Sequence, residues 1–235
     1  MTPDLAPQLP ATFAATRESL RMLACYVISP ARKARTGRIG LRPTGDGFGT
    51  PPFDDGSRVR VSGNRLVLDP GASIPVTTLS AAADFVGISL SPNPGLGTDL
   101  PAFAPGIELM VDADASWALG ACYAFADHVL GLLAADEKAV TDPQLWPEHF
   151  DLAVQVDLGE TITVNVGLSP GDQAFPDPYF YVGPHDTNHL TGTYWNAPFG
   201  AILPYDALIS ATSPQQRARR FITEGLDLLR ASTGR

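Results

Sequence analysis

The chain has 235 residues, of which 44% are hydrophobic, and a formal net charge of -9 at pH 7. The 22 glycines and 22 prolines are spread along the chain, so they indicate many turns and exclude a long disordered linker. Residues 66–216 hold one basic and eighteen acidic side chains, and this balance disfavours nucleic acid as a partner. Two interpretations of the acidic middle stay open: a solvated surface, or a site for a cation or cationic ligand.

The N-terminal residues MTPDLAPQLPATF lack the basic and continuous apolar stretches of a signal peptide. The longest apolar stretch, residues 117–135, is interrupted by Asp127 and His128. Cys25 and Cys122 lie among apolar neighbours, as free thiols in a reducing compartment often do. We therefore expect a cytoplasmic protein that has no membrane partner.

The first predicted element is a helix over residues 12–30, where apolar residues recur at spacings of three and four. Pro30 is expected to end it. A basic cluster follows at Arg32, Lys33, Arg35 and Arg38. It can complement the negative end of the helix dipole or bind an anion, and we favour the first role.

Short extended segments broken by glycine and proline follow from residue 38. RVRVSGNRLVLD predicts a hairpin around residues 62–64, and a short helix is expected near residues 80–86. Residues 91–111 have the character of a long connection. We expect residues 1–235 to form a single domain, and any boundary between two halves to fall within 91–111.

A second long helix is predicted over residues 115–135, followed by two alternating strands at 149–157 and 161–168. Matching their apolar faces places Val156 opposite Ile162 and Asp151 opposite Gly167. The last helix is predicted over residues 213–231, with Ser213 as N-cap. The strands follow one another without intervening helices, which favours an α+β fold with an antiparallel sheet and flanking helices.

The two halves of the chain share a sequence pattern. Residues 40–53, GLRPTGDGFGTPPF, match residues 167–180, GLSPGDQAFPDPYF, when small shifts are allowed. Each copy follows an Ala-Cys-Tyr step and precedes a Pro-x-x-x-Leu step. A pseudo-twofold internal duplication would produce one continuous antiparallel sheet, with Asp46 and Asp172 in equivalent turns. The recurring use of glycine, proline and aspartate in turns is the alternative explanation.

The candidate site begins at LWPEHFDLA, residues 145–153. His149 and Asp151 are two residues apart on a predicted strand, so they are expected side by side on its polar face, with Gly167 leaving room above them. A solvated strand face is the plainer interpretation of this pair.

Further polar and aromatic residues follow in YFYVGPHDTNH and TYWNAPFG. Imidazole, carboxylate, phenol and indole groups are typical of a small-ligand pocket, although tyrosines are also simply good strand formers. Histidines four apart suggest a metal only on a helix, and Pro184 with Asn188 predicts a loop, so we expect no metal site. The candidate ligand-binding residues are His149, Asp151, Asp172, Tyr179, Tyr181, His185 and Trp195.

Several familiar motifs are absent from the sequence: a phosphate-binding glycine loop before a helix, Gly-x-Ser-x-Gly, Cys-x-x-Cys and His-Glu-x-x-His. Common nucleotide-dependent, hydrolase and zinc-protease activities are therefore disfavoured. The sequence indicates no particular cofactor, and it leaves open whether the protein is an enzyme.

The segments LWPEHFDLA, GLSPGD, PYFYVGP and FGAILPYDAL resemble a family of uncharacterised actinobacterial proteins of unknown function, nearly end to end. The resemblance implies no reaction or ligand. Our leading hypothesis is a small-molecule-binding protein that uses the polar sheet face around His149 and Asp151. The alternative is a protein-interaction module without catalytic activity.

Overall fold

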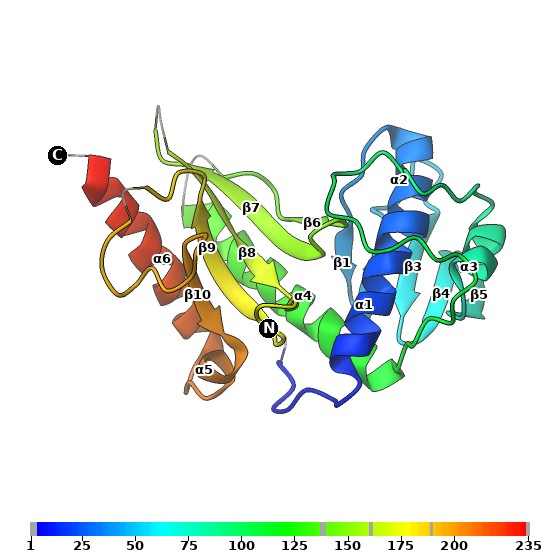
Figure 1. The fold of residues 1–235 in the computed structure, drawn as a ribbon, viewed down its shortest axis with the longest axis horizontal. Helices are drawn as coiled ribbons and strands as arrows, with labels where there is room; N and C mark the ends of the chain where they lie inside the picture. The colour runs from blue at the N-terminus through cyan, green and yellow to red at the C-terminus, as the bar shows by residue number, and fades with distance from the viewer. Residues whose placement is uncertain (1–3, 137–139, 160–161, 189, 234–235) are drawn as a thin grey trace. The chain divides into compact units, whose positions relative to one another are not determined.

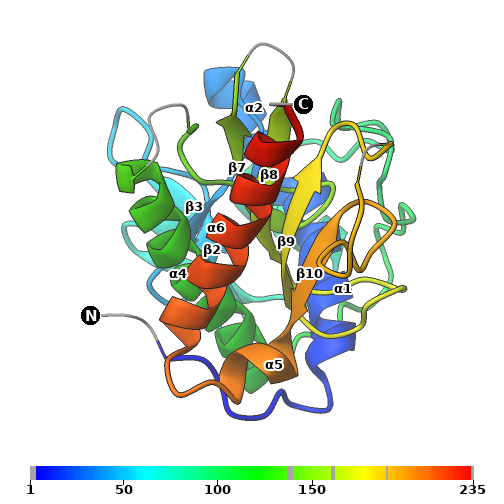
Figure 2. The ribbon, with the colours of Figure 1, turned by 90° about the vertical axis from the view of Figure 1, so that its left-hand side faces the viewer.

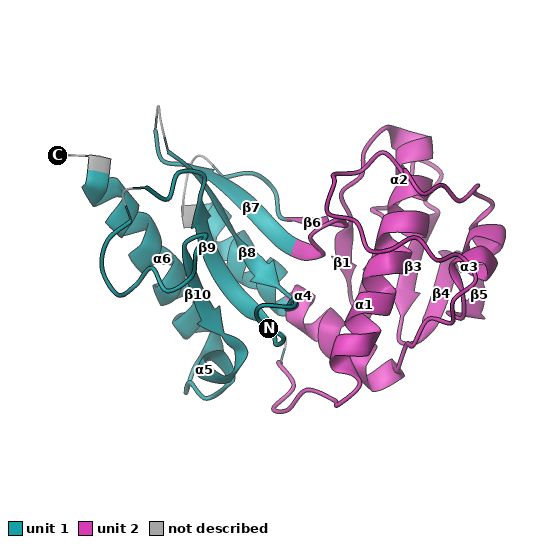
Figure 3. Ribbon diagram, viewed as in Figure 1, with its two compact units in different colours: residues 1–4, 125–143, 152–235 teal, residues 5–124, 144–151 magenta. Residues whose placement is uncertain are grey.

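The computed structural model describes residues 4–136, 140–159, 162–188 and 190–233. These residues form antiparallel sheets flanked by helices, which confirms the predicted α+β class (Figure 1). The chain divides into two compact units (Figure 3): unit 1 is residues 1–4, 125–143 and 152–235, and unit 2 is residues 5–124 and 144–151. The division does not fall at 91–111, which lies wholly within unit 2. It falls instead within the long helix α4 (Ala113–Asp136) and on either side of the 144–151 segment.

The sheet of unit 2 is a five-stranded antiparallel meander in the order β1-β2-β3-β4-β5. Its central hairpin, β3–β4, turns at residues 63 and 64 as predicted, and Gly63 supplies the positive φ of 54° that this turn needs. Gly120 of α4 packs directly on Gly47 of β2, where an added Cβ would meet backbone at 2.9 Å. The strands are β1 (Arg42–Thr44), β2 (Gly47–Gly49), β3 (Arg58–Ser62), β4 (Arg65–Asp69) and β5 (Ala72–Pro75).

The first helix of unit 2 does not end at Pro30. α1 (Phe13–Leu23) continues through a π-helical turn (Ala24–Ile28, labelled η1) into α2 (Ser29–Thr36). The wider π turn pairs the Ser29 N–H with the Ala24 carbonyl and places Pro30 in the first turn of α2, where its missing N–H costs little. Gly37, at φ 72°, ends the helix instead.

Two further elements complete unit 2. α3 (Leu79–Val86) begins where the Thr78 side chain accepts a hydrogen bond from the Ala81 N–H, in agreement with the helix predicted near residues 80–86. β6 (Gln144–Trp146) enters the unit by a backbone pairing of Leu145 with Leu41.

Unit 1 contains a second antiparallel meander in the order β10-β9-β8-β7. Its register differs from the predicted one, because Val156 pairs with Val164 rather than Ile162, and Ala153 rather than Asp151 lies opposite Gly167. A shift of two residues keeps every side chain on its predicted face, so the alternation alone did not distinguish the two registers. The strands are β7 (Asp151–Asp157), β8 (Thr163–Ser169), β9 (Tyr179–Pro184) and β10 (Ala201–Pro204).

Helices cover one face of the unit 1 sheet. Phe180 of β9 is fully buried and meets Phe125 of α4 edge to face, with ring centroids 6.0 Å apart. α6 (Pro214–Thr233) lies along β9 and β10 (Figure 2), and its first turn is capped by the Ser213 hydroxyl as predicted. α5 (Tyr205–Ile209) links β10 to α6. Tyr179 and Tyr181 alternate with Phe180 and therefore occupy the opposite face of the sheet.

Helix, meander and helix recur in that order in the two halves of the chain, as the duplication hypothesis requires. The strands form two separate sheets, however, so the single continuous sheet expected from a duplication is wrong. The duplication itself stays a prediction.

α4 is long and apolar enough to span a bilayer by length and composition, but 56% of its most apolar window is buried. Core helices of folded domains pass the same test.

Candidate functional site

His149 and Asp151 do not lie side by side on a strand. β7 begins at Asp151, and residues 147–150 form a turn. Phe150 has a φ of 56°, a left-handed conformation that breaks the alternation between its two neighbours. The predicted pairing of His149 with Asp151 is therefore wrong, because a local turn replaces the first two residues of the expected strand.

The His149 side chain is 63% exposed and belongs to a surface ion cluster of unit 2. Its Nδ1 lies 3.7 Å from Oδ2 of Asp99, and the Arg21 guanidinium lies 3.2 Å from the same oxygen. Arg21 also donates to the backbone carbonyl of Glu148 at 2.6 Å. These contacts tie the 147–150 turn to α1, and exposed ion pairs of this kind contribute little free energy.

Asp151, by contrast, is only 8% exposed and lies near the aromatic core of unit 2. Tyr123 donates its hydroxyl to the Phe150 carbonyl at 2.6 Å, which holds the turn against α4. Burial, and then the nearby Asp151, raise the pKa of Tyr123 well above its usual value, so the phenol stays neutral. The rings of Phe48, Tyr123 and Phe150 meet edge to face with centroids 5.2 to 6.2 Å apart, and we call these three residues the core triad.

The candidates on β9 form a different aromatic group, on the sheet face of unit 1 that does not carry Phe180. Phe175, Tyr179 and Phe199 pack with ring centroids 5.4 to 6.3 Å apart, and we call them the pocket triad. Tyr181 adjoins this triad, 6.4 Å from both Tyr179 and Phe199. Gly167 does leave room above the sheet, and Tyr181 takes that room, since an added Cβ would meet its hydroxyl oxygen at 2.9 Å.

Asp172 fixes the loop that carries the pocket triad. Its Oδ1 accepts hydrogen bonds from the N–H groups of Ala174 and Phe175, at 2.7 and 2.9 Å. Its Oδ2 accepts a hydrogen bond from the Tyr179 hydroxyl at 2.7 Å. Asp172 therefore positions Phe175 and Tyr179, which belongs to the same group of candidate residues.

A pocket of about 170 Å³ opens beside the pocket triad, entirely within unit 1. Its walls are aromatic or apolar, and its only charged lining residues are two exposed aspartates, Asp177 and Asp206. Tyr179 is the one earlier candidate that lines it. The full lining is Phe175, Pro176, Asp177, Pro178, Tyr179, Ile202, Pro204, Tyr205 and Asp206.

Most of this lining was not predicted from the sequence. The signal was present in FPDPYF and LPYDA, where aromatic residues, prolines and an aspartate alternate. Only the pairing of β10 with β9, which places Pro204 beside Tyr179, brings the two segments together. That long-range contact cannot be read from either segment alone.

Two remaining candidates lie elsewhere in unit 1. His185 is exposed just after β9, where its backbone N–H donates to the Thr163 carbonyl at 3.0 Å. Trp195 packs edge to face on Tyr194, which stacks on Phe221 of α6 and donates its hydroxyl to the Phe221 carbonyl. His189, the other histidine of this segment, lies outside the described residues.

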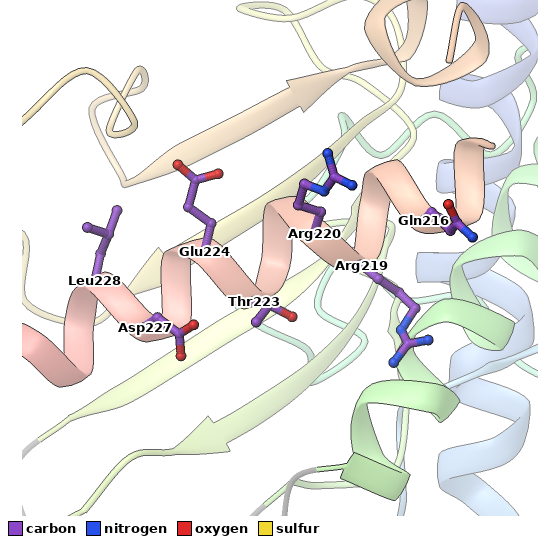
Figure 4. A pocket seen from close by; sticks show the side chains of 7 residues that line it. All are labelled: Gln216, Arg219, Arg220, Thr223, Glu224, Asp227 and Leu228. Atoms are coloured by element: carbon purple, nitrogen blue, oxygen red, sulfur yellow. The ribbon is translucent and has the colours of Figure 1, made fainter. Parts of the chain in front are cut away.

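Other features of the described residues offer little chemistry. The Cys25 thiol is buried and donates to the Pro147 carbonyl at 3.0 Å, and burial raises its pKa to about 12, which makes it a poor nucleophile at neutral pH. No group of three or more histidine, cysteine or acidic side chains suited to a metal is found in the described part of the chain. A hollow of about 670 Å³ lies along α6, but all of its lining residues belong to the exposed side of that one helix (Figure 4).

No protein-family model matches the chain, and no curated protein or solved structure matches it either. The resemblance to an actinobacterial family stays a prediction. Any functional assignment therefore depends on the geometry of the chain's own residues.

Proposed function

We propose that the protein binds a small organic cation, such as an amine or quaternary ammonium compound, in the pocket beside the pocket triad. The observation that carries this proposal is the lining itself: three aromatic rings and three prolines, with carboxylates as the only charges. Aromatic faces attract cations, and Asp177 and Asp206 add a negative potential at the rim.

The size of the pocket restricts the ligand. Its volume of about 170 Å³ is below the range of about 300–1,000 Å³ typical of drug-sized ligands. A compact ligand of a few heavy atoms fits this volume better than a nucleotide or a peptide.

The chain also holds the pocket in shape before any ligand arrives. Asp172 ties the 172–175 turn to Tyr179, and β10 fixes Pro204 and Ile202 beside β9. Asp206 lies in the first turn of α5, where its Oδ1 accepts a hydrogen bond from the Ala207 N–H at 2.7 Å. A preformed site loses less conformational entropy on binding.

The test is an isothermal titration of the full chain with choline and with its neutral isostere 3,3-dimethylbutan-1-ol. Choline should bind more tightly, and the double variant Asp177→Asn/Asp206→Asn should weaken choline binding about three- to tenfold. Asp227→Asn, which removes an exposed carboxylate on α6, is the matched control and should leave choline affinity unchanged. Equal affinity for the two ligands would refute the cationic assignment, and binding of neither would refute the pocket.

A second candidate function, docking of a protein partner, is favoured by three exposed apolar side chains of unit 2. Ile107, Met110 and Trp117 are 61%, 62% and 53% exposed. Exposed apolar surface of this kind often marks a protein-binding region. A docking module of this kind has no affinity for choline or its isostere, so the same titration separates the two functions.

A further inference from the structure

The exposed side of α6 carries four charged residues in a regular pattern. Arg217, Arg220, Glu224 and Asp227 are all exposed and follow one another at spacings of three, four and three residues. This spacing places side chains along one stripe of a helix, as in the seam of a coiled coil. We call these four residues the α6 stripe. Three of them line the hollow of about 670 Å³, and Arg220 and Glu224 point to the same side of the helix (Figure 4).

The order of charges along the α6 stripe does not serve the helix itself. The two bases lie in its first two turns and the two acids follow, whereas the helix dipole favours acids near the N-terminus and bases near the C-terminus. Arg230 forms a 3.0 Å ion pair with Asp227, but both groups are exposed, so this pair contributes little free energy. The stability of α6 therefore gives no reason for two bases followed by two acids.

The same order of charges is complementary to itself. Arg220 and Glu224 lie two residues on either side of residue 222, and Arg217 and Asp227 lie five residues on either side of it. A twofold axis at the level of residue 222 places a second, antiparallel copy of the helix so that residues equally far from 222 lie at the same level. Arg220 of each copy then lies level with Glu224 of the other, and Arg217 lies level with Asp227. A parallel pair would instead place like charges at the same level, which is unfavourable.

The surroundings of the α6 stripe suit such a contact. Leu228, one turn beyond Glu224, is 41% exposed, and the aliphatic stems of the two arginines add further apolar surface. The opposite side of α6 holds its buried apolar residues and contacts β9 and β10. The α6 stripe therefore faces away from the core of unit 1.

We propose that the α6 stripe docks on the α6 stripe of a second copy of the chain, with the two helices antiparallel. A partner of one charge sign would be repelled by half of the stripe, whereas a second copy matches both halves. One helix face is small for a protein interface, and exposed ion pairs are weak and screened by salt. The dimer is therefore weak and dissociates at high ionic strength. Its surface shares no residue with the cation pocket, so self-association does not depend on the proposed function.

The experiment is analytical ultracentrifugation of the full chain over a wide concentration range, at low and at high salt. At low salt the average mass should rise with concentration toward that of a dimer, and high salt should reverse this rise. Arg220→Glu should raise the dimer dissociation constant about tenfold or more, because attractive contacts become repulsive. Arg38→Glu makes the same charge change at an exposed position of unit 2 and should leave the constant within about twofold of wild type.

A charge-swapped pair of variants tests the orientation of the two helices. Glu224→Arg alone should weaken self-association as Arg220→Glu does. An equimolar mixture of the two variants should form a heterodimer about as tight as the wild-type dimer, since opposite charges again lie level. Both positions are exposed, and circular dichroism verifies that the variants retain their helices.

Three results would overturn the proposal. A wild type that stays monomeric at low salt would exclude the dimer. Self-association of equal strength in wild type and Arg220→Glu would exclude the α6 stripe as its contact surface. A mixture of the two variants that forms no heterodimer would exclude the antiparallel pairing.

Discussion

The core triad of unit 2 and the pocket triad of unit 1 use the same type of contact. Their ring centroids lie 5.2 to 6.2 Å and 5.4 to 6.3 Å apart, respectively. Phe48, Tyr123 and Phe150 are at most 1% exposed, however, whereas Phe175 and Tyr179 of the pocket triad line a cavity and Phe199, which does not line it, is 38% exposed at the surface. Enclosed rings stabilise the fold, while rings with an open side remain available to a ligand.

The hydrogen-bond acceptors of the two tyrosine hydroxyls also differ between the core triad and the pocket triad. Tyr123 donates to a backbone carbonyl and thereby holds a turn against a helix. Tyr179 donates to the carboxylate of Asp172, which also caps the loop leading into the pocket. The first arrangement stabilises the packing of unit 2, and the second shapes a cavity.

The largest expected effect is on the core triad. Phe150→Ala leaves a cavity among fully buried rings and should lower the free energy of unfolding by about 3–5 kcal/mol. Phe199→Ala removes a partly exposed ring and should lower the free energy of unfolding by less than about 1.5 kcal/mol. Urea denaturation followed by circular dichroism measures both, and similar losses for the two variants would contradict the difference between the triads.

Tyr123→Phe is expected to have a smaller effect. It leaves the Phe150 carbonyl without its donor in a buried site, which should cost about 1–3 kcal/mol. Tyr179→Phe removes the hydroxyl that donates to Asp172. Because Asp172 is more accessible to water than the Phe150 carbonyl, the loss of free energy of unfolding should be smaller than in Tyr123→Phe. Choline affinity should be unchanged in Tyr123→Phe and should fall only slightly in Tyr179→Phe, because Tyr179→Phe retains the ring and loses only the hydrogen bond to Asp172.

The pH dependence of stability tests the turn that carries Phe150, since Cys25 donates to Pro147 at its start. The pKa of this thiol is about 12 in the folded chain against 9.0 for the exposed group. The contribution of the protonated thiol to the free energy of unfolding is present in full below pH 9. It is lost as the pH rises toward 12, because the thiol of the unfolded chain releases its proton at a lower pH than that of the folded chain. Stability should fall by up to about 1.4 kcal/mol per pH unit from this group.

Cys25→Ala is the matching variant. Denaturation curves at several pH values above 9 should show a shallower loss of stability in the variant than in the wild type. Equal slopes would mean that the thiol is accessible to solvent in the folded chain.

The smallest expected effect is that of Asp172→Asn. The amide oxygen can still accept the hydrogen bonds from the loop N–H groups, and the amide N–H group can donate to the Tyr179 hydroxyl oxygen, so stability should change by less than about 1 kcal/mol. Choline binding should weaken only slightly, which titration calorimetry measures. A loss as large as that of the Asp177→Asn/Asp206→Asn variant would place Asp172 in direct contact with the ligand.

The sequence predicted local structure well and the site only in part. Periodicity and capping located the helix near residues 80–86, α4 and α6, since both signals are carried by neighbouring residues. The 147–150 turn was missed because Phe150 adopts a left-handed conformation in which glycine is usual. Pro30 was misread as a helix end, because a π turn accommodates it.

The site was predicted where its residues are close in sequence and missed where strand pairing creates it. Tyr179, Tyr181 and Asp172 belong to one loop and strand, and the sequence grouped them. Tyr205 and Asp206 reach the pocket only because β10 pairs with β9. Alternation identifies a strand's two faces but carries no information on which other segment will lie beside it.

The most direct test of the proposed cation site is an NMR titration of the full chain, labelled at aromatic carbons, with choline. Resonances of Phe175, Tyr179 and Tyr205 should shift progressively and saturate, while those of Tyr123 and Phe150 should not move, because the core triad is closed to solvent. Shifts confined to residues outside the pocket, or no saturable shift at Tyr179, would contradict the proposal.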